Sequence, residues 1–350
     1  MMRSVSRFIG VSATLALSIG ALGAFAAEPA PAYSIIERWN VGGTGSWDFL
    51  TLDAPSHRLF ITRGERVDVL DTRTGSIVGH IPDTHGVHGV ALAHDLKRGY
   101  TSNGKANTIT EFDLETLAVL RTVQVKGDDP DPIFYLPSSQ QVLAFNSHSH
   151  NINVFDAKSL KLVATVKVPG PPEFGVDDGA GHVFVNMESE PGELVRIDTK
   201  SLKVTATWKL PGCDSPTGLA LDATHQHLFS VCDHNVMAVT DARTGHQVAQ
   251  IPIGLGPDAA AFDPERGITF ISSRDGTLTI VGREPDGRYV VRQSLTTMVG
   301  AKTMAYDQET GRVYLVSAEF GATPGATPEN PKPRPEQKPG SFTVLVVAPR

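Results

Sequence analysis

Histidines and carboxylates are the residues of this sequence with the clearest potential for chemistry. Imidazole together with carboxylate is a donor set that suits zinc, copper or another transition ion. Five of the twelve histidines stand in short polar segments between apolar runs and are candidate metal ligands: His85, His88, His148, His150 and His234. The three-residue spacing of the first two is no known ligand motif for a loop, so hydrogen bonding to water and backbone is the competing interpretation.

An acidic segment, Asp128-Asp129-Pro130-Asp131-Pro132, offers a second kind of site. Calcium prefers oxygen ligands, and an exported protein encounters calcium. The twelve-residue spacing of an EF-hand is absent, however, and two prolines suit a tight turn. We therefore favour a structural loop here over a calcium site.

The two cysteines, Cys213 and Cys232, stand on either side of a predicted hairpin whose turn covers residues 223–226. Antiparallel pairing places them roughly opposite one another, as a disulfide requires. Two free thiols or a thiolate ligand are the alternatives.

The elements that must position these residues are short strands in a repeated pattern. Apolar segments alternate with a period near two, as in Val67-Asp68-Val69-Leu70-Asp71, which indicates strand. The third segment of a unit often ends in Asp followed by a turn that closes on Gly or Leu. The first strands of successive units end near Asp53, Asp95, Pro137, Asp177, Asp222, Asp263 and Asp307. Four short strands every 40–45 residues predict the blade of a β-propeller.

Seven units predict an all-β, seven-bladed propeller over residues 33–350. The last unit has only three strands of its own, while a lone strand, residues 34–41, precedes the first unit. We expect that strand to pair with residues 342–347 and so to close the ring. A proline-rich insertion, residues 320–341, interrupts the last blade and is either a lid or docking arm or a solvated loop.

Propeller topology brings two sets of loops to one mouth of the axial channel, so residues distant in sequence become neighbours. We expect a small molecule or a protein partner to bind there. The candidate binding residues are Trp47, Asp48, His85, His88, Asp131, Glu173, Asp258 and Lys302.

The N-terminus predicts export. Arg3 and Arg7 precede an apolar run that ends in Ala24-Phe25-Ala26, which indicates a signal peptide over residues 1–26, followed by a flexible stretch, 27–32. An uncleaved anchor is the alternative. No later segment is long and apolar enough to span a bilayer, so we expect a periplasmic or secreted monomer. Cleavage would change the net charge from −7 to −9, which argues against nucleic-acid binding.

The segments Arg58–Thr62 with Val67–Gly75, and Leu228–Ser230 with Ile251–Asp258, resemble the YVTN repeat of bacterial propellers. Asn146 and Asn186 occupy the asparagine place of that repeat, whereas Arg63, Cys232 and Ser273 depart from it. The whole chain after the predicted signal peptide is similar to the exported, seven-bladed, YncE-like members. The resemblance implies the fold, and it implies no catalytic residues, because that family shares none.

Three functions fit these observations. The first is a non-catalytic propeller that binds its ligand at the mouth, because no Gly-x-Ser-x-Gly, phosphate-binding loop or His-Glu-x-x-His motif is present. The second is a metal-assisted lactone hydrolase or lyase, with His88 as base and Asp131 or Glu173 as ligand. The third is an accessory role in quinone-cofactor oxidation. The second and third rest on analogy between propellers of similar fold, and any cofactor beyond a divalent metal is unknown.

Overall fold

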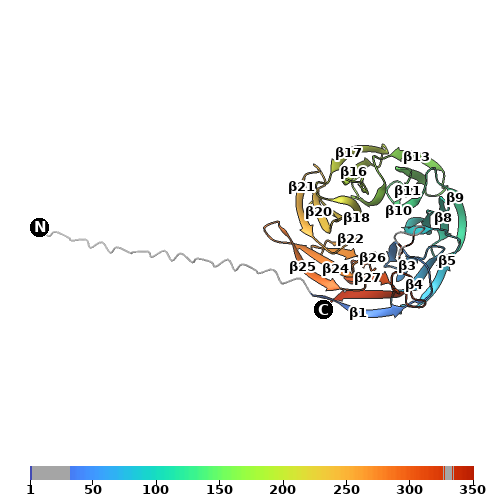
Figure 1. Cartoon of the computed structure of the whole chain (residues 1–350). Coiled ribbons are helices and arrows are strands. Elements are labelled where there is room, and N and C mark those ends of the chain that lie inside the picture. Colours follow the sequence, from blue (N-terminus) through green and yellow to red (C-terminus); the bar gives the residue numbers. More distant parts are fainter. Residues whose placement is uncertain (2–31, 326, 328–332, 334) are drawn as a thin grey trace. The chain divides into compact units, whose positions relative to one another are not determined.

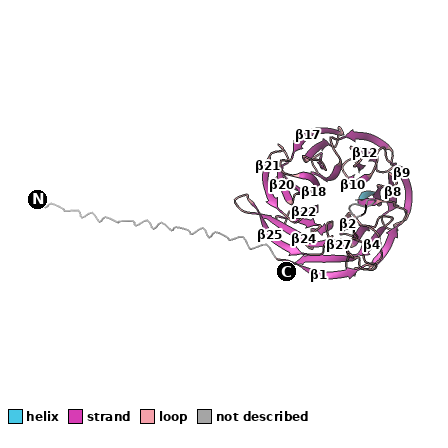
Figure 2. Ribbon diagram, viewed as in Figure 1, coloured by secondary structure: helices cyan, strands magenta, loops and turns pink. Residues whose placement is uncertain are grey.

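The computed structural model describes residues 1, 32–325, 327, 333 and 335–350. The predicted signal peptide after Met1, and residues 27–31 of the predicted flexible stretch, lie outside the described residues. Residues 33–350 form seven antiparallel four-stranded sheets arranged in a ring (Figure 1). Strands make up nearly all of the regular structure (Figure 2), and the only helix in the described part of the chain is the 3₁₀ turn η1 (His94–Leu96).

In blades 1–6 the strands run from the ring axis outwards in chain order. Blade 1 holds β2 (Leu50–Asp53), β3 (Arg58–Thr62), β4 (Val67–Asp71) and β5 (Ile77–Ile81). Blade 2 holds β6 (Val87–Ala93), β7 (Arg98–Asn103), β8 (Thr108–Asp113) and β9 (Val119–Gln124). Blade 3 holds β10 (Pro130–Leu136), β11 (Gln141–Asn146), β12 (Asn151–Asp156) and β13 (Leu162–Lys167). Blade 4 holds β14 (Pro172–Asp177), β15 (His182–Met187), β16 (Glu193–Asp198) and β17 (Lys203–Lys209).

The remaining blades complete the ring. Blade 5 holds β18 (Asp214–Asp222), β19 (His227–Asp233), β20 (Val236–Asp241) and β21 (Gln247–Pro252). Blade 6 holds β22 (Pro257–Asp263), β23 (Ile268–Ser273), β24 (Thr277–Arg283) and β25 (Tyr289–Thr296). Blade 7 holds β26 (Met304–Asp307), β27 (Arg312–Ser317), β28 (Thr343–Pro349) and β1 (Tyr33–Asn40).

The predicted closure of the ring is confirmed, because β1 is the outer strand of blade 7. It pairs antiparallel with β28 from Tyr33 opposite Pro349 to Asn40 opposite Thr343. The Gln293 side chain in the neighbouring blade also bonds both backbone groups of Tyr33, each at 2.8 Å. The two ends of the propeller thus share one sheet, and opening the ring requires loss of that whole ladder.

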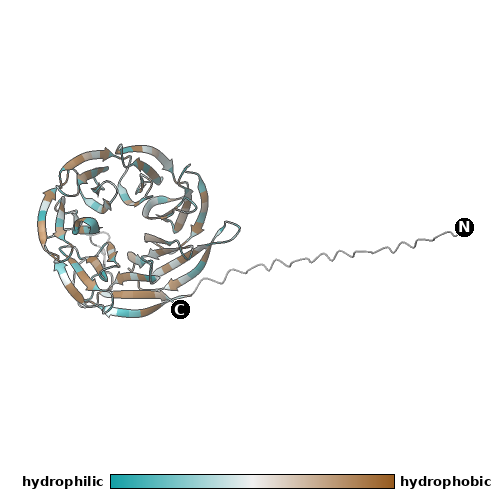
Figure 3. Cartoon of the chain, turned by 180° about the vertical axis from the view of Figure 1, so that it is seen from behind, coloured by the Kyte–Doolittle hydropathy of each residue, from teal (hydrophilic) through white to brown (hydrophobic). Residues whose placement is uncertain are grey.

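Apolar residues are concentrated along the strands (Figure 3), and the core lies between adjacent blades. Phe60 of blade 1 packs on Phe112 of blade 2, for example, with their ring centroids 6.0 Å apart. A blade alone would leave both faces of its sheet in water, so stacking in a ring is what buries them.

Each of the seven outer strands carries an irregularity in its pairing with the strand inside it, as between Val69 and Leu70 against β5. A bulge twists an exposed edge and disrupts its row of free hydrogen-bonding groups. The outer edges of the ring are therefore poor templates for pairing with another chain.

The turn after the third strand explains the recurrent Asp and Gly. In blade 1 the Asp71 carboxylate accepts a hydrogen bond from the Arg73 amide at 2.8 Å, and Gly75 has φ +70°. A Cβ on Gly75 would lie 2.4 Å from the Trp39 ring, so this position requires glycine for its space as well as its backbone. Where leucine replaces it, as at Leu117 and Leu160, the residue still adopts positive φ and buries its side chain.

Candidate functional site

Seven equivalent positions, one at the start of each inner strand, surround one mouth of the ring. In five blades the residue just before the position, such as Pro130 or Pro257, pairs with the second strand of the blade. The pairing register then shifts, and the next residue in the chain occupies the position. In blades 1 and 7 it lies two residues before β2 and β26. We call these residues, which are 40–44 positions apart in the sequence, the mouth ring: Asp48, His88, Asp131, Glu173, Thr217, Asp258 and Lys302.

The mouth ring is an ionic network centred on two cations. His88 Nδ1 lies 2.6 Å from Asp48 Oδ2 and 3.6 Å from Asp131 Oδ1, and its Nε2 lies 3.6 Å from Asp129 Oδ1. Lys302 Nζ lies 2.7 Å from Asp258 Oδ2 and 3.8 Å from Asp48 Oδ1. The topology therefore brings together six of the predicted binding residues, because Glu173 adds its charge to the same network.

Buried polar side chains of the second strands hold the backbone of the mouth ring. Ser102 donates a hydrogen bond to the Asp131 carbonyl, and Ser272 donates one to the Lys302 carbonyl. The Asn186 amide donates to the Thr217 carbonyl at 2.9 Å, which gives the asparagine of the repeat a structural role. Each of these bonds runs from one blade to the next, so the ring positions are fixed by their neighbours.

Space beside His88 is kept open by a glycine. A Cβ on Gly104 would lie 2.3 Å from Asp129 Oδ1 and 2.7 Å from His88 Nε2. No larger residue at this position would allow Asp129 and His88 to approach each other as they do.

Three half-buried aromatic rings contact one another across the inner strands next to the mouth ring. The Phe174 ring lies 5.5 Å from that of Phe49 and 5.6 Å from that of Phe134, between centroids. We call these three residues, which come from blades 1, 3 and 4, the aromatic floor. Cavities of about 300 and 470 Å³ have floor residues in their walls, and neither is lined by a residue of the mouth ring. The polar mouth ring and the cavities beside the aromatic floor are therefore separate features of the channel.

Burial of charge in this recess shifts several pKa values. Burial tends to lower the pKa of His88, but the carboxylates of Asp129 and Asp48 outweigh that effect and raise it to about 11. Burial raises the pKa of Asp131 to about 7, against the attraction of His88. Burial also raises the pKa of Glu173 well above its usual range, and the charge of Asp131 adds to the rise.

Lys302 and Asp258 form the second half of the network. Burial raises the pKa of Asp258, and the charge of Lys302 opposes that rise. For Lys302 burial acts in the lowering direction, but the charges of Asp258 and Asp48 raise its pKa overall. Lys302 is thus paired with Asp258 at 2.7 Å, and Asp131 and Glu173 lack a lysine or arginine partner among the described residues.

A metal ion could be held at one place in this network. Ligand atoms of Asp48, His88 and Asp131 lie within 4.8 Å of one another, and no other group of three histidines, cysteines or carboxylates in the described residues is this close. The buried Asp131 Oδ1 receives no hydrogen bond. The donor set, one imidazole and two carboxylates, suits a transition ion better than calcium.

The other predicted metal ligands lie apart from this group. His85 is exposed and lies 2.6 Å from Glu65, and His234 is exposed and lies 3.4 Å from Asp214. His150 is in an exposed turn, with φ +48°. His148 reaches the network only indirectly, since its Nε2 lies 3.4 Å from the Asp129 carboxylate.

Trp47, a predicted binding residue, packs beside the mouth ring without joining its ionic contacts. Its ring lies 5.2 Å from that of Phe342 and 6.1 Å from that of Phe320, at the base of the proline-rich insertion. The Arg63 guanidinium, buried at 2% exposure, lies 3.5 Å from the centre of the Phe342 ring. This cluster supports the loop that carries Asp48.

Some residues of the site escaped sequence reasoning. The acidic segment with Asp129 is predicted to lie at the mouth, but Asp129 is not among the candidate binding residues, and no sequence pattern indicates the aromatic floor or the supporting serines. The sequence could indicate Phe49 and Phe174 only because each directly follows an acidic residue of the mouth ring.

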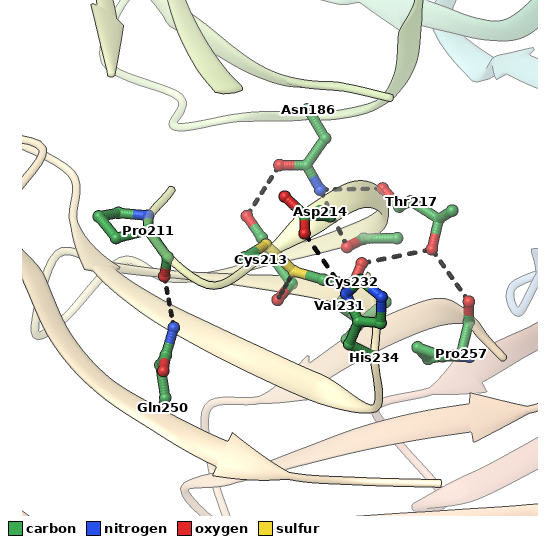
Figure 4. Close-up of a disulfide and its surroundings, with 12 residues drawn as sticks. Asn186, Pro211, Cys213, Asp214, Thr217, Val231, Cys232, His234, Gln250 and Pro257 are labelled. Carbon is green, nitrogen blue, oxygen red and sulfur yellow. Dashed lines mark hydrogen bonds and ion pairs between the residues drawn. A yellow bond between two sulfur atoms is a disulfide. The ribbon is translucent and has the colours of Figure 1, made fainter. Parts of the chain in front are cut away.

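The cysteines form a disulfide in blade 5, with Cα atoms 5.2 Å apart. Figure 4 shows it beside Thr217 and Asn186, so it ties the segment before β18 to β19 close to the mouth ring. Both cysteines are fully buried, and His234 pairs with the adjacent Asp214.

We predict that loss of this disulfide lowers the free energy of unfolding by about 3 kcal/mol, because the bridge restricts a loop of about 20 residues in the unfolded chain. Urea unfolding of the oxidised protein and of a Cys213→Ala, Cys232→Ala double variant measures the difference. The variant serves as its own control, since added reductant should leave its midpoint unchanged. Equal midpoints for the two proteins would contradict the prediction.

Comparison with known proteins supports the fold alone. No family model matches the chain, and no curated protein does. Among solved structures, the chain is similar to the Kuenenia stuttgartiensis hydrazine synthase, with a TM-score of 0.69 and 15% identity over 78% of this chain and 94% of that one. The relationship to the YVTN-repeat propellers stays a prediction.

No helix in the part of the chain that the structure describes is long and apolar enough to cross a membrane.

Proposed function

We propose that this protein is an exported, non-catalytic propeller that binds its ligand through a divalent metal ion in the mouth ring. The observation that carries the proposal is the buried Asp131 carboxylate, whose Oδ1 receives no hydrogen bond and lies 3.6 Å from His88 Nδ1. Buried charge is costly unless it is paired. Asp131 Oδ1 has only the 3.6 Å contact with His88, and a cation between Asp48, His88 and Asp131 would give it a direct ligand contact.

The predicted signal sequence and the disulfide both favour export, since disulfides persist in oxidising compartments. Zn²⁺ is the metal that we expect, because imidazole and carboxylate are both among its ligands. Binding must displace the proton that His88 carries near neutrality, so the affinity should rise with pH.

Zn²⁺ binding measured by isothermal titration calorimetry at pH 6, 7 and 8 tests the proposal. We expect one ion per chain, with an affinity that increases severalfold for each pH unit. His88→Asn should weaken binding at least 100-fold, and His85→Asn, which alters an exposed histidine outside the cluster, should leave it unchanged. Absence of stoichiometric binding at pH 8, or equal loss in both variants, would overturn the proposal.

Catalysis is the second candidate, and one observation favours it. The pKa of Asp131, raised by burial to about 7, suits a general base at neutral pH, whereas the pKa of His88 near 11 keeps that imidazole protonated. In a hydrolase or lyase, Asp131 would therefore be a better base than His88, and it would then act as a free carboxylate and not as a ligand of the metal. Turnover of a lactone by the Zn²⁺-loaded protein, lost in Asp131→Asn, would distinguish an enzyme from a binding protein.

A further inference from the structure

The charges around the mouth are unevenly distributed. Acidic residues and His88 occupy the mouth ring in blades 1–4, and blade 6 adds Asp258, whereas Lys302 comes from blade 7, which adjoins blade 1. Its ammonium group lies 2.7 Å from one carboxylate, that of Asp258, and 3.8 Å from Asp48. Asp48 thus stands between the lysine and the proposed metal.

A second cation, Arg274, extends this basic side. Its backbone amide donates to the Gly256 carbonyl at 2.8 Å, and its carbonyl accepts from the Gly300 amide at 2.7 Å. Those two glycines precede Asp258 and Lys302 by two residues each, so Arg274 sits between the two chain segments that lead into this side of the mouth ring.

The Arg274 side chain is exposed and has no carboxylate partner among the described residues. The adjacent carboxylate, Asp275, is used elsewhere, since it accepts hydrogen bonds from the Leu255 and Thr277 amides at 2.7 and 2.9 Å. The guanidinium therefore retains its donors for a ligand, and it is near enough for its charge to act on both Asp258 and Lys302.

We propose that the ligand of the mouth ring is a small dicarboxylate, which places one carboxylate on the metal and the other on Arg274, with Lys302 between them. This inference rests on the proposed function, because the metal provides the first contact. Carboxylate oxygens are ligands of divalent metals, and a planar guanidinium matches a carboxylate with two parallel hydrogen bonds. The short separation of Lys302 from Asp48 favours a compact dicarboxylate over an extended one.

Calorimetry with malonate as the probe tests the inference on the full chain, with and without one equivalent of Zn²⁺. We expect malonate to bind at least tenfold more tightly to the Zn²⁺-loaded protein, and acetate and sulfate to bind at least tenfold more weakly than malonate. Arg274→Gln should weaken malonate binding tenfold or more and leave Zn²⁺ affinity unchanged. Arg243→Gln is the matched control, because that exposed arginine pairs with Asp241 in a turn between third and fourth strands.

The outcomes separate the two proposals. Zn²⁺ binding with no malonate binding, or with equal malonate affinity in Arg274→Gln, overturns the dicarboxylate inference and leaves the metal site standing. Malonate affinity that does not depend on Zn²⁺ also overturns it, as does tighter binding of sulfate than of malonate. Failure of Zn²⁺ to bind overturns the proposed function itself.

Discussion

Asp131→Asn is expected to make the metal-free protein more stable at pH 8 while it abolishes stabilisation by Zn²⁺. The carboxylate is buried over the aromatic floor, and it lies among Asp48, Asp129 and Asp258, whose charges oppose its ionisation. Asparagine has nearly the same shape and carries no charge. Asp131 would then be required for metal binding and would lower the stability of the metal-free protein.

The sign and the pH range follow from the pKa of Asp131, which is about 7 in the folded protein and 3.8 in an unfolded chain. The folded state binds the proton more tightly, so wild-type stability falls as pH rises between these values. The gain in Asp131→Asn should be small near pH 4, grow towards pH 7 and level off above it. One pKa unit corresponds to about 1.4 kcal/mol, so a rise from 3.8 to about 7, which already includes the attraction of His88, corresponds to a gain on the order of 4 kcal/mol.

Urea unfolding of both proteins from pH 4 to 8, with and without Zn²⁺, measures these effects. Asp128→Asn is the control, because that carboxylate lies three residues away and is exposed. It should change neither the pH profile nor the response to Zn²⁺. A metal-free Asp131→Asn protein that is less stable than wild type at pH 8 would contradict the prediction.

The fold could be predicted because a propeller repeats one local pattern. The alternation in Val67–Asp71, the Asp turn and the regular spacing all describe a single blade, and seven copies leave few arrangements. The turn predicted at residues 223–226 does separate β18 from β19. Errors were confined to ends: β1 begins and ends one residue earlier than predicted, and the inner strands of blades 2 and 3 end at Ala93 and Leu136 rather than at Asp95 and Pro137.

The site was harder to predict because the pairing register of each inner strand decides which residue reaches the mouth ring. His85 and His88 are three residues apart, yet only the second follows the paired residue at the start of an inner strand, and so only it joins the mouth ring. In four of the five blades with this shift in pairing, a proline stands directly before the mouth-ring residue (Pro130, Pro172, Pro216 and Pro257), but Val87 stands before His88, so proline alone would have missed the histidine. The aromatic floor depends on contacts between opposite blades, which a repeat pattern does not reveal.

Phe174→Ala is expected to bring water to the mouth ring from below. Phe174 contacts both other rings of the floor and lines both adjoining cavities. Burial is the largest cause of the raised pKa of the neighbouring Glu173. Hydration should therefore lower that pKa towards its usual range, and the fall in wild-type stability with rising pH should become shallower.

Phe184→Ala is the matched control for this variant, because Phe184 is buried between blades and stacks on Trp208, away from the floor. Removal of the buried Phe184 ring should lower the free energy of unfolding by about 3 kcal/mol at pH 5, and removal of the half-buried Phe174 ring should lower it by less, since the cost follows the buried surface that is lost. Only Phe174→Ala should recover part of that loss between pH 5 and 8. Carboxyl carbon shifts of labelled glutamate, followed by NMR over the same range, would report the Glu173 titration directly, and an unchanged midpoint would show that the floor does not control hydration of the site.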